Sequence, residues 1–313
     1  MGQGLHVIFG TGPVGCWTAR ALRESGNPVK AVNRSGKRPG LMPADVDVVA
    51  ADISDTEQAV NAARGAAVVY QAANPPYHEW HRYFPGLQAG ALAAATAAGA
   101  RYVSIENLYM YDASSPMNED SRVAPKSKKG ELRARMAEEV MQAHRRGNVR
   151  ATALRSSDYY GPGVVGSAFG DRAVGALLSG RKAQVLGSPD TPHSYAYIED
   201  VGRAAATLGM RDEALGKVWI APHAPAMTQR GMVEKACALL GIGPQFAVIS
   251  PAMMRMAGLF VPGARASVEM MYEFLEPFVV DARRIETVFG LIPTPVEIGL
   301  KRTVGWYAAH VKR

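Results

Sequence analysis

The chain has very little cysteine, and its two cysteines, Cys16 and Cys237, are too few for a disulfide framework. We therefore expect a reduced, cytoplasmic setting. Long apolar runs are also lacking. The longest bland stretch, LQAGALAAATAAGA, is rich in alanine rather than leucine and ends before Arg101, which predicts a tightly packed helix and not a membrane span. No basic segment with a cleavage site precedes LHVIFG, so no signal peptide is expected.

The chain also lacks a long basic tract interleaved with aromatic residues, which argues against a nucleic-acid partner. Lys and Arg number 35 against 28 Asp and Glu, giving a net charge of +7 and a pI near 9.4. Such a balance suits anionic small molecules. We expect a small-molecule substrate, no nucleic acid, no membrane partner and no metal site, in a monomer or a homodimer.

The first half of the chain alternates short apolar runs with segments of helical pattern. The runs are LHVIFG, NPVKAVNR, VDVVAADI, AAVVYQAA, RYVSIEN and VRATALR, and a later run is KVWIA. The longer helical segments between them cover 13–25, 79–98 and 128–146. Strands separated by helices of this length form βαβ units with right-handed crossovers. The pattern predicts an α/β protein with a doubly wound parallel sheet, the Rossmann fold.

A glycine-rich turn, FGTGPVG, joins the first of these strands to the first helix. Gly10, Gly12 and Gly15 have the spacing G-x-G-x-x-G, with Pro13 and Val14 between the last two. In this position Gly10 permits a tight turn, Gly12 lets the backbone approach a pyrophosphate, and Gly15 allows close packing of helix on strand. The free N–H groups at the start of the helix bind the anion. The turn therefore predicts a dinucleotide site.

The end of the second strand indicates which dinucleotide is bound. An NAD site usually has Asp or Glu there, to bind the ribose 2′-hydroxyl. This chain has Asn33, Arg34 and Ser35 instead, and an arginine clamps a phosphate with two hydrogen bonds. The residues favour NADP(H) over NAD(H), the alternative being that Arg34 is only a solvated turn residue.

After residue 155 the alternation stops, and Gly and Pro cluster in DYYGPGVVG, SPDTPHS and APHAPA. A helix at about 164–179 and a strand at 183–187 are expected between these clusters. We divide the chain into an NADP-binding domain at 1–155, to which 193–221 return, and a smaller, partly interleaved, mainly helical substrate domain at 156–192 and 222–313. The cleft between them is the expected ligand site.

Several further segments, in their order along the chain, resemble the extended or atypical short-chain dehydrogenase/reductase superfamily, near the NAD-dependent epimerase/dehydratase and NmrA-like proteins. Asp52 and Ile53 resemble its adenine-contacting pair, and Ala72, Ala73 and Asn74 resemble the segment along the adenosine ribose. LRSSDYYGPG (154–163) and HSYAYIEDV (193–201) resemble two of its later motifs. The resemblance covers nearly the whole chain and implies binding of a nicotinamide dinucleotide.

The chain departs from that superfamily at its catalytic residues. The family pattern has Ser or Thr after the fifth strand, where this chain has Asn107, and Tyr-x-x-x-Lys on the next helix. That helix begins in KSKKGELRARMAEEV, which contains no tyrosine. Three alignments remain open, and they place these pairs at the Tyr and Lys positions: Glu131 and Arg135, Gly130 and Ala134, or Lys129 and Arg133.

A second departure concerns the substrate. His193 stands where members that act on nucleotide sugars often have an arginine that contacts a substrate phosphate. A nucleotide sugar is therefore a less favoured substrate for this chain. Tyr159, Tyr160 and the methionine-rich segments at 253–256 and 270–271 suit an apolar or aromatic substrate, although the methionines also suit a plain core.

Three functions remain open from the sequence. The first is an oxidoreductase with a relocated acid, for which Tyr109 and Tyr111 are the candidates. In it Asn107 holds a carbonyl, and Lys129 or Arg133 binds the ribose or stabilises an oxyanion. The second is a non-catalytic NADP(H)-sensing protein of the NmrA-like kind. The third is a non-redox epimerase, lyase or cyclase with an idle cofactor.

Overall fold

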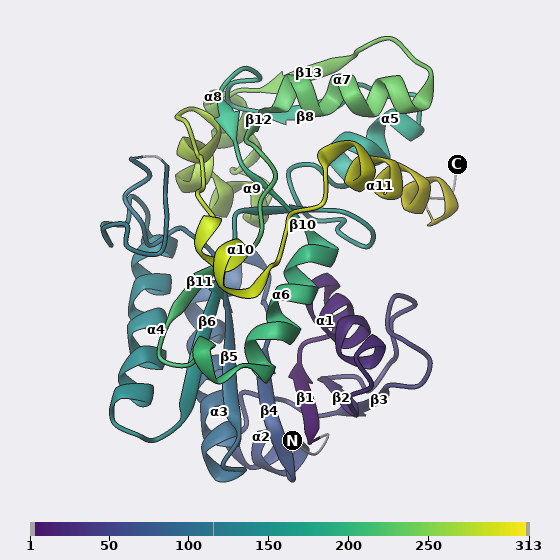
Figure 1. Cartoon of the computed structure of the whole chain (residues 1–313). Helices are drawn as coiled ribbons and strands as arrows, with labels where there is room; N and C mark the ends of the chain where they lie inside the picture. Colours follow the sequence, from purple (N-terminus) through teal and green to yellow (C-terminus); the bar gives the residue numbers. More distant parts are fainter. Residues whose placement is uncertain (1–3, 115, 311–313) are drawn as a thin grey trace.

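The computed structural model describes residues 4–114 and 116–310. Its centre is a seven-stranded parallel sheet in the order β11-β6-β5-β4-β1-β2-β3 (Figure 1). In chain order its strands are β1 (Leu5–Phe9), β2 (Val29–Asn33), β3 (Asp47–Ala50), β4 (Ala66–Gln71), β5 (Arg101–Glu106), β6 (Arg150–Arg155) and β11 (Val218–Ile220). The order reverses between β1 and β4, and ligands bind at such a switch point, beyond the carboxyl ends of the strands. The predicted doubly wound α/β fold is confirmed.

The strands form because each is an apolar run that is covered on both faces. Ile8 belongs to one apolar core with α1 (Pro13–Glu24) and α6 (Ile198–Met210). Val7 and Phe9 belong to the other core, with α2 (Thr56–Ala62), α3 (Trp80–Ala97) and α4 (Lys128–Arg145). A parallel sheet buried on both faces needs such continuous runs rather than alternation.

The rest of the chain is built from short elements that gather beyond the carboxyl ends of the sheet strands (Figure 1). Its short strands are β7 (Asp158–Tyr160), β8 (Ala183–Leu186), β9 (Pro192–His193), β10 (Tyr195–Tyr197), β12 (Met227–Thr228) and β13 (Phe246–Ile249). They pair as β10 with β7, β12 with β9 and β13 with β8. Its α-helices are α5 (Ala176–Leu178), α7 (Gln229–Leu240), α8 (Pro251–Ala257), α9 (Pro262–Ser267), α10 (Arg283–Phe289) and α11 (Val296–His310). Four segments of the whole chain are short 3-10 or π helices: η1 (Tyr77–Glu79), η2 (Asp171–Gly175), η3 (Asp212–Ala214) and η4 (Val268–Phe274).

The helix expected at about 164–179 is present only over its second half. Residues 164–170 are irregular, and only the π-helical η2 and the short α5 follow. Gly166 and Gly170 lie in this irregular part, and each glycine weakens a helix by about 1 kcal/mol. The strand expected at 183–187 is present as β8, but it pairs with β13 instead of joining the central sheet.

Across the described ranges, no helix combines the length and the apolar character that a membrane crossing requires.

Candidate functional site

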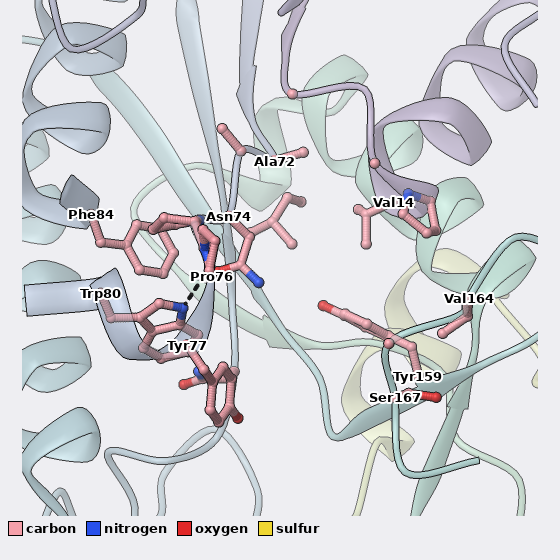
Figure 2. A pocket seen from close by; sticks show the side chains of 18 of the residues that line it. Val14, Ala72, Asn74, Pro76, Tyr77, Trp80, Phe84, Tyr159, Val164 and Ser167 are labelled. Carbon is pink, nitrogen blue, oxygen red and sulfur yellow. Dashed lines mark hydrogen bonds between the residues drawn. The ribbon is translucent and has the colours of Figure 1, made fainter. Parts of the chain in front are cut away.

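A cavity of about 850 Å³ lies at the carboxyl ends of β1, β4 and β5 and is closed from the other side by residues of α8, α9 and η4. This volume is in the range of small-molecule and cofactor sites. Figure 2 shows Val14 and Ala72 on one side of it, the aromatic residues Tyr77, Trp80 and Phe84 on another, and Tyr159 opposite them.

The glycine loop forms one end of this cavity. Gly10 has φ +106°, and a Cβ there would lie 2.5 Å from the backbone nitrogen of Ala73. A Cβ on Gly15 would lie 2.0 Å from the carbonyl oxygen of Gly10, whereas one on Gly12 would meet nothing within 4 Å. Space is therefore left only on the side where a pyrophosphate would approach. Gly12 caps α1, whose first turn carries no acidic residue, so the positive end of the helix faces that space.

The turn after β2 is held against the glycine loop by Asn33. Its Oδ1 accepts hydrogen bonds from the backbone N–H groups of Ser35 (3.0 Å) and Gly36 (2.7 Å), and its Nδ2 donates to Oγ1 of Thr11 (2.8 Å). The exposed Arg34 projects from this turn. Asn33 thus sets the position of Arg34 relative to the loop.

A second, shallower hollow of about 440 Å³ lies beside the turn, and we call it the basic hollow. Its lining residues are Thr11, Asn33, Arg34, Ser35, Lys37, Arg38 and Pro39. Among the described residues, three cations and no carboxylate border it. It is shaped to accept an anionic group next to the dinucleotide cavity.

The other sequence-predicted cofactor residues also border the main cavity. They are Pro13, Val14, Asp52, Ile53, Ala72, Ala73 and Asn74. Hydrogen bonds from the side chain and backbone of Ser54, helped by the charge of Arg34, lower the pKa of Asp52. Asp52 therefore carries a charge that fixes its own turn.

Helix α4 decides the register that the sequence leaves open. Ser127 caps the helix by accepting from the N–H of Gly130, and Leu132, Met136 and Val140 are buried. Arg133 is 2% exposed and borders the cavity. Its guanidinium lies 4.5 Å from the centre of the Phe84 ring, and Nη2 donates to the carbonyl oxygen of Ile105 (3.2 Å).

Arg133 is therefore a buried cation beside the cavity. Burial lowers its pKa, and in the described part of the chain its Nε has no hydrogen-bond partner. The alignment of Gly130 and Ala134 offers no functional side chain, and Glu131 and Arg135, the other pair, are exposed. The structure thus brings Arg133, and not that pair, to the site.

Lys129 is buried but is turned away from the cavity. Its Nζ donates to the carbonyl oxygen of Ala266 (2.7 Å) and to Oε1 of Glu269 (2.7 Å). It ties α4 to the segment that begins at α9, and the described lining residues do not include it. The expected role in binding the ribose is not supported by this position.

Replacing Lys129 by methionine is expected to lower the free energy of unfolding by about 1.5–3 kcal/mol, because hydrogen bonds to charged groups contribute about that much. The affinity for NADPH should change little. Urea unfolding and a fluorescence titration measure the two effects. Lys128→Met is the matched control, since Lys128 is exposed. An unchanged stability with weakened NADPH binding would restore the original expectation.

Tyr77 and Tyr109 share a hydrogen bond between their hydroxyl groups, and we call them the tyrosine pair. Both border the cavity, and Trp80 stacks on Tyr109 with ring centres 6.1 Å apart. The Trp80 indole donates to the carbonyl oxygen of Pro75 (3.0 Å), as Figure 2 shows. Burial raises the pKa of each hydroxyl well above its usual value.

The sequence analysis missed Tyr77, Trp80 and Phe84. Their spacing of three and then four residues was a usable signal, because such residues share one face of a helix. Asn107, which was predicted, does border the cavity, and its Oδ1 accepts from the backbone N–H of Tyr109 (3.3 Å).

Tyr111 lies elsewhere and is 1% exposed. Its hydroxyl accepts from Nη1 of Arg155 (2.5 Å), and Arg155 forms a buried ion pair with Glu106 (2.8 Å). Tyr111 is not among the described residues that border the cavity. The structure therefore gives it a position in the core and not that of a proton donor.

Of the predicted substrate residues, only Tyr159 borders the cavity, and its hydroxyl accepts from Oγ of Ser156 (2.9 Å). Tyr160 packs against Tyr197 in a core of the C-terminal part. His193 lies between the rings of Phe274 and Phe278, with Nε2 3.1 Å from Oδ2 of Asp158.

Tyr160 and His193 are therefore placed behind the wall of the cavity. Their burial among aromatic rings leaves no surface toward a substrate. The expected methionines are divided: Met254, Met270 and Met271 border the cavity, while Met253 and Met256 are exposed.

Solved structures similar to this chain include three sugar-nucleotide or related epimerases. A nucleoside-diphosphate-sugar epimerase from Pseudomonas aeruginosa has a TM-score of 0.78 at 18% identity, over 99% of each chain. UDP-glucuronic acid 4-epimerase from Bacillus cereus, in complex with NAD, has a TM-score of 0.78 at 16% identity, over 98% of this chain and 100% of the other. An epimerase from Methanothermobacter thermautotrophicus has a TM-score of 0.81 at 15% identity, over 98% and 92%. At these identities the likeness shows the fold.

The family assignment has independent support in the sequence itself. A search of curated proteins gave no match. However, residues 7–219, which include the glycine loop, the tyrosine pair and the start of β11, match the profile of the NAD dependent epimerase/dehydratase family. The chain belongs to the NAD dependent epimerase/dehydratase family.

Proposed function

We propose that the protein is an NADP(H)-dependent oxidoreductase that acts on a small carbonyl, alcohol or enone with an apolar or aromatic body. The observation that carries this proposal is one cavity that runs from the glycine loop to an aromatic wall containing the tyrosine pair. When bound, the dinucleotide supplies or accepts a hydride. Gly10, Gly12, Gly15 and the start of α1 would hold its pyrophosphate.

The basic hollow supports NADP(H) over NAD(H). Arg34, Lys37 and Arg38 border it, and Arg34 stands at the end of β2, where a 2′-phosphate would lie. Two other proteins of similar structure were solved in complex with NAD. The preference therefore rests on the residues of this chain alone.

The substrate end of the cavity contains groups suited to a carbonyl oxygen. Tyr109 presents a hydroxyl supported by Tyr77, Asn107 presents an amide, and Arg133 presents a buried cation. Donors placed where negative charge develops stabilise the transition state. We assign the relocated proton transfer to Tyr109, in place of the tyrosine that α4 lacks.

A sugar nucleotide fits this end less well. His193, at the position of the phosphate-binding arginine, is buried away from the cavity, while the acidic residue Asp158 borders it and would repel a diphosphate. Arg172, which is exposed, also borders the cavity. UDP-sugars therefore belong in the substrate tests.

Replacing Arg34 by alanine is expected to weaken NADPH binding about tenfold to a hundredfold and to leave NADH binding unchanged. A charge-assisted phosphate contact contributes about 1.5–3 kcal/mol. Titration of protein fluorescence with each dinucleotide measures both affinities. Arg64→Ala, an exposed arginine outside the basic hollow, is the control. Equal affinities of the wild-type protein for NADPH and NADH would reject the cofactor assignment.

Steady consumption of NADPH with a panel of ketones, enals, quinones and UDP-sugars tests the reaction. Turnover of a carbonyl or enone supports the proposal. Tight NADPH binding without any turnover would favour the sensing protein, and a product formed without net NADPH consumption would favour a non-redox epimerase, lyase or cyclase.

A further inference from the structure

Glu273 places a carboxyl group in a buried position beside the cavity. It lies on η4, is 2% exposed and borders the cavity. In the described part of the chain its Oε1 has no hydrogen-bond partner, and no Lys, Arg or His side chain forms an ion pair with it. An ionised carboxylate is very costly in such surroundings, so the group is stable there only as a neutral acid.

Among the described residues, no lysine or arginine side chain pairs with Glu273. Asp158 on β7 adds to the effect of burial, and together they raise the pKa of Glu273 well above its usual 4.5. The tyrosine pair borders the same cavity from η1 and from the loop after β5, and Tyr272 precedes Glu273 on η4. Nδ1 of His193 lies 3.1 Å from its backbone carbonyl oxygen, and Nε2 lies 3.1 Å from Oδ2 of Asp158.

The same surroundings make the tyrosine pair a poor final source of a proton. In the superfamily pattern a lysine lowers the pKa of the catalytic tyrosine. Here burial raises it. Nζ of Lys129 lies 5.3 Å from the centre of the Tyr77 ring, but Glu269 neutralises it. A tyrosinate left behind would be strongly disfavoured unless its proton were replaced at once.

We propose that Glu273 supplies the proton of the reaction and that the tyrosine pair passes it to the substrate oxygen. This inference rests on the proposed oxidoreductase function. During reduction, a dinucleotide held by the glycine loop would supply a hydride to the carbonyl carbon, and the π electron pair of the carbonyl would move to its oxygen. The oxygen takes the Tyr109 proton, Tyr109 takes one from Tyr77, and Tyr77 takes one from Glu273. Glu273 ends as a carboxylate and regains a proton from solvent, and oxidation of the alcohol reverses each transfer.

Glu273→Gln is expected to lower kcat about 10²–10⁴-fold, the usual contribution of acid–base catalysis, while the Kd for NADPH stays the same. Glu276→Gln is the matched control, because Glu276 lies on the same segment but pairs with Lys126 outside the cavity. In the reduction direction the wild-type kcat should fall as pH rises through the raised pKa of Glu273. The residual kcat of Glu273→Gln should not show this decrease with pH, which is one limb of the wild-type pH profile. Full activity of Glu273→Gln, or an identical limb in its profile, overturns the proposal.

A second test needs neither substrate nor cofactor. Between the ordinary carboxyl pKa and the raised one, the folded state holds a proton that the unfolded state has lost, so stability falls as pH rises. The folding equilibrium constant of the wild type, divided by that of Glu273→Gln, should fall by about tenfold per pH unit within this window. Glu273→Leu serves the same comparison if the glutamine variant does not fold.

The two tests separate the inference from the function on which it rests. A flat ratio between about pH 5 and pH 8 shows an ionised Glu273 and overturns the proton-supply role whatever the turnover assays give. A sloping ratio together with no wild-type turnover on any substrate overturns the proposed function, and with it the role of Glu273, though not its protonation. A sloping ratio together with the lost pH limb supports both.

Discussion

Replacing Tyr109 by phenylalanine is expected to lower kcat about 10²–10⁴-fold, because it removes the hydroxyl that borders the cavity and bonds to Tyr77. The affinity for NADPH should stay the same, since the glycine loop and Arg34 lie at the other end. Tyr77→Phe should lower kcat as well, by interrupting the transfer from Glu273. Kinetics under saturating NADPH, with a parallel binding titration, measure these effects.

Tyr111→Phe provides the matched control for this prediction. Its hydroxyl bonds to Arg155 in the core, so the change should reduce thermal stability and leave kcat nearly intact. A large loss of kcat in Tyr111→Phe, with full activity in Tyr109→Phe, would show that the assignment from the structure is reversed. Tyr159, across the cavity, would be the next hydroxyl to test if both variants stay active.

The second large effect is on stability. Replacing Arg155 by leucine should lower the free energy of unfolding by about 3–5 kcal/mol, because it leaves the Glu106 carboxylate buried without its partner. The pair is joined at 2.8 Å, and Oγ of Ser104 gives Glu106 one further hydrogen bond at 3.0 Å. Urea unfolding followed by circular dichroism measures the loss.

Arg145→Leu is the control, since Arg145 pairs with Glu138 at the surface, where both side chains are 55% exposed. The expected loss there is about 0–1 kcal/mol. Adding Glu106→Gln to Arg155→Leu should restore part of the stability. If it restores none, the unpaired charge is not the reason for the loss.

The fold was predictable from the sequence because a doubly wound sheet imposes a local pattern. Each sheet strand is an apolar run that lies between two helical layers, and its length and spacing show in the sequence. The start of the segment at 164–179 was not predictable in this way, since residues 164–170 pack into the cavity wall and the C-terminal core as irregular chain before η2 begins.

The two ends of the candidate site also differ in how far they could be predicted from the sequence. The dinucleotide end is formed by short motifs, such as the glycine loop and Asn33–Arg34, in which neighbouring residues act together. The substrate end brings Tyr77, Tyr109 and Glu273 together from three distant segments. Only packing of η4 over the sheet makes Glu273 their neighbour, and no local pattern reports that packing. The register of α4 stayed open for the same reason, because Lys129 and Arg133 are both buried but face different elements.

The position of η4 in the sequence affects how the substrate end of the cavity can evolve. Met270, Met271, Glu273 and Phe274 all border the cavity from this one short element, while the dinucleotide end is encoded far upstream. One wall of the substrate end is thus encoded apart from the dinucleotide end. Exchange of α9 and η4, by recombination or by design, would change this wall while the dinucleotide end is inherited unchanged, provided that the new stretch keeps Glu273.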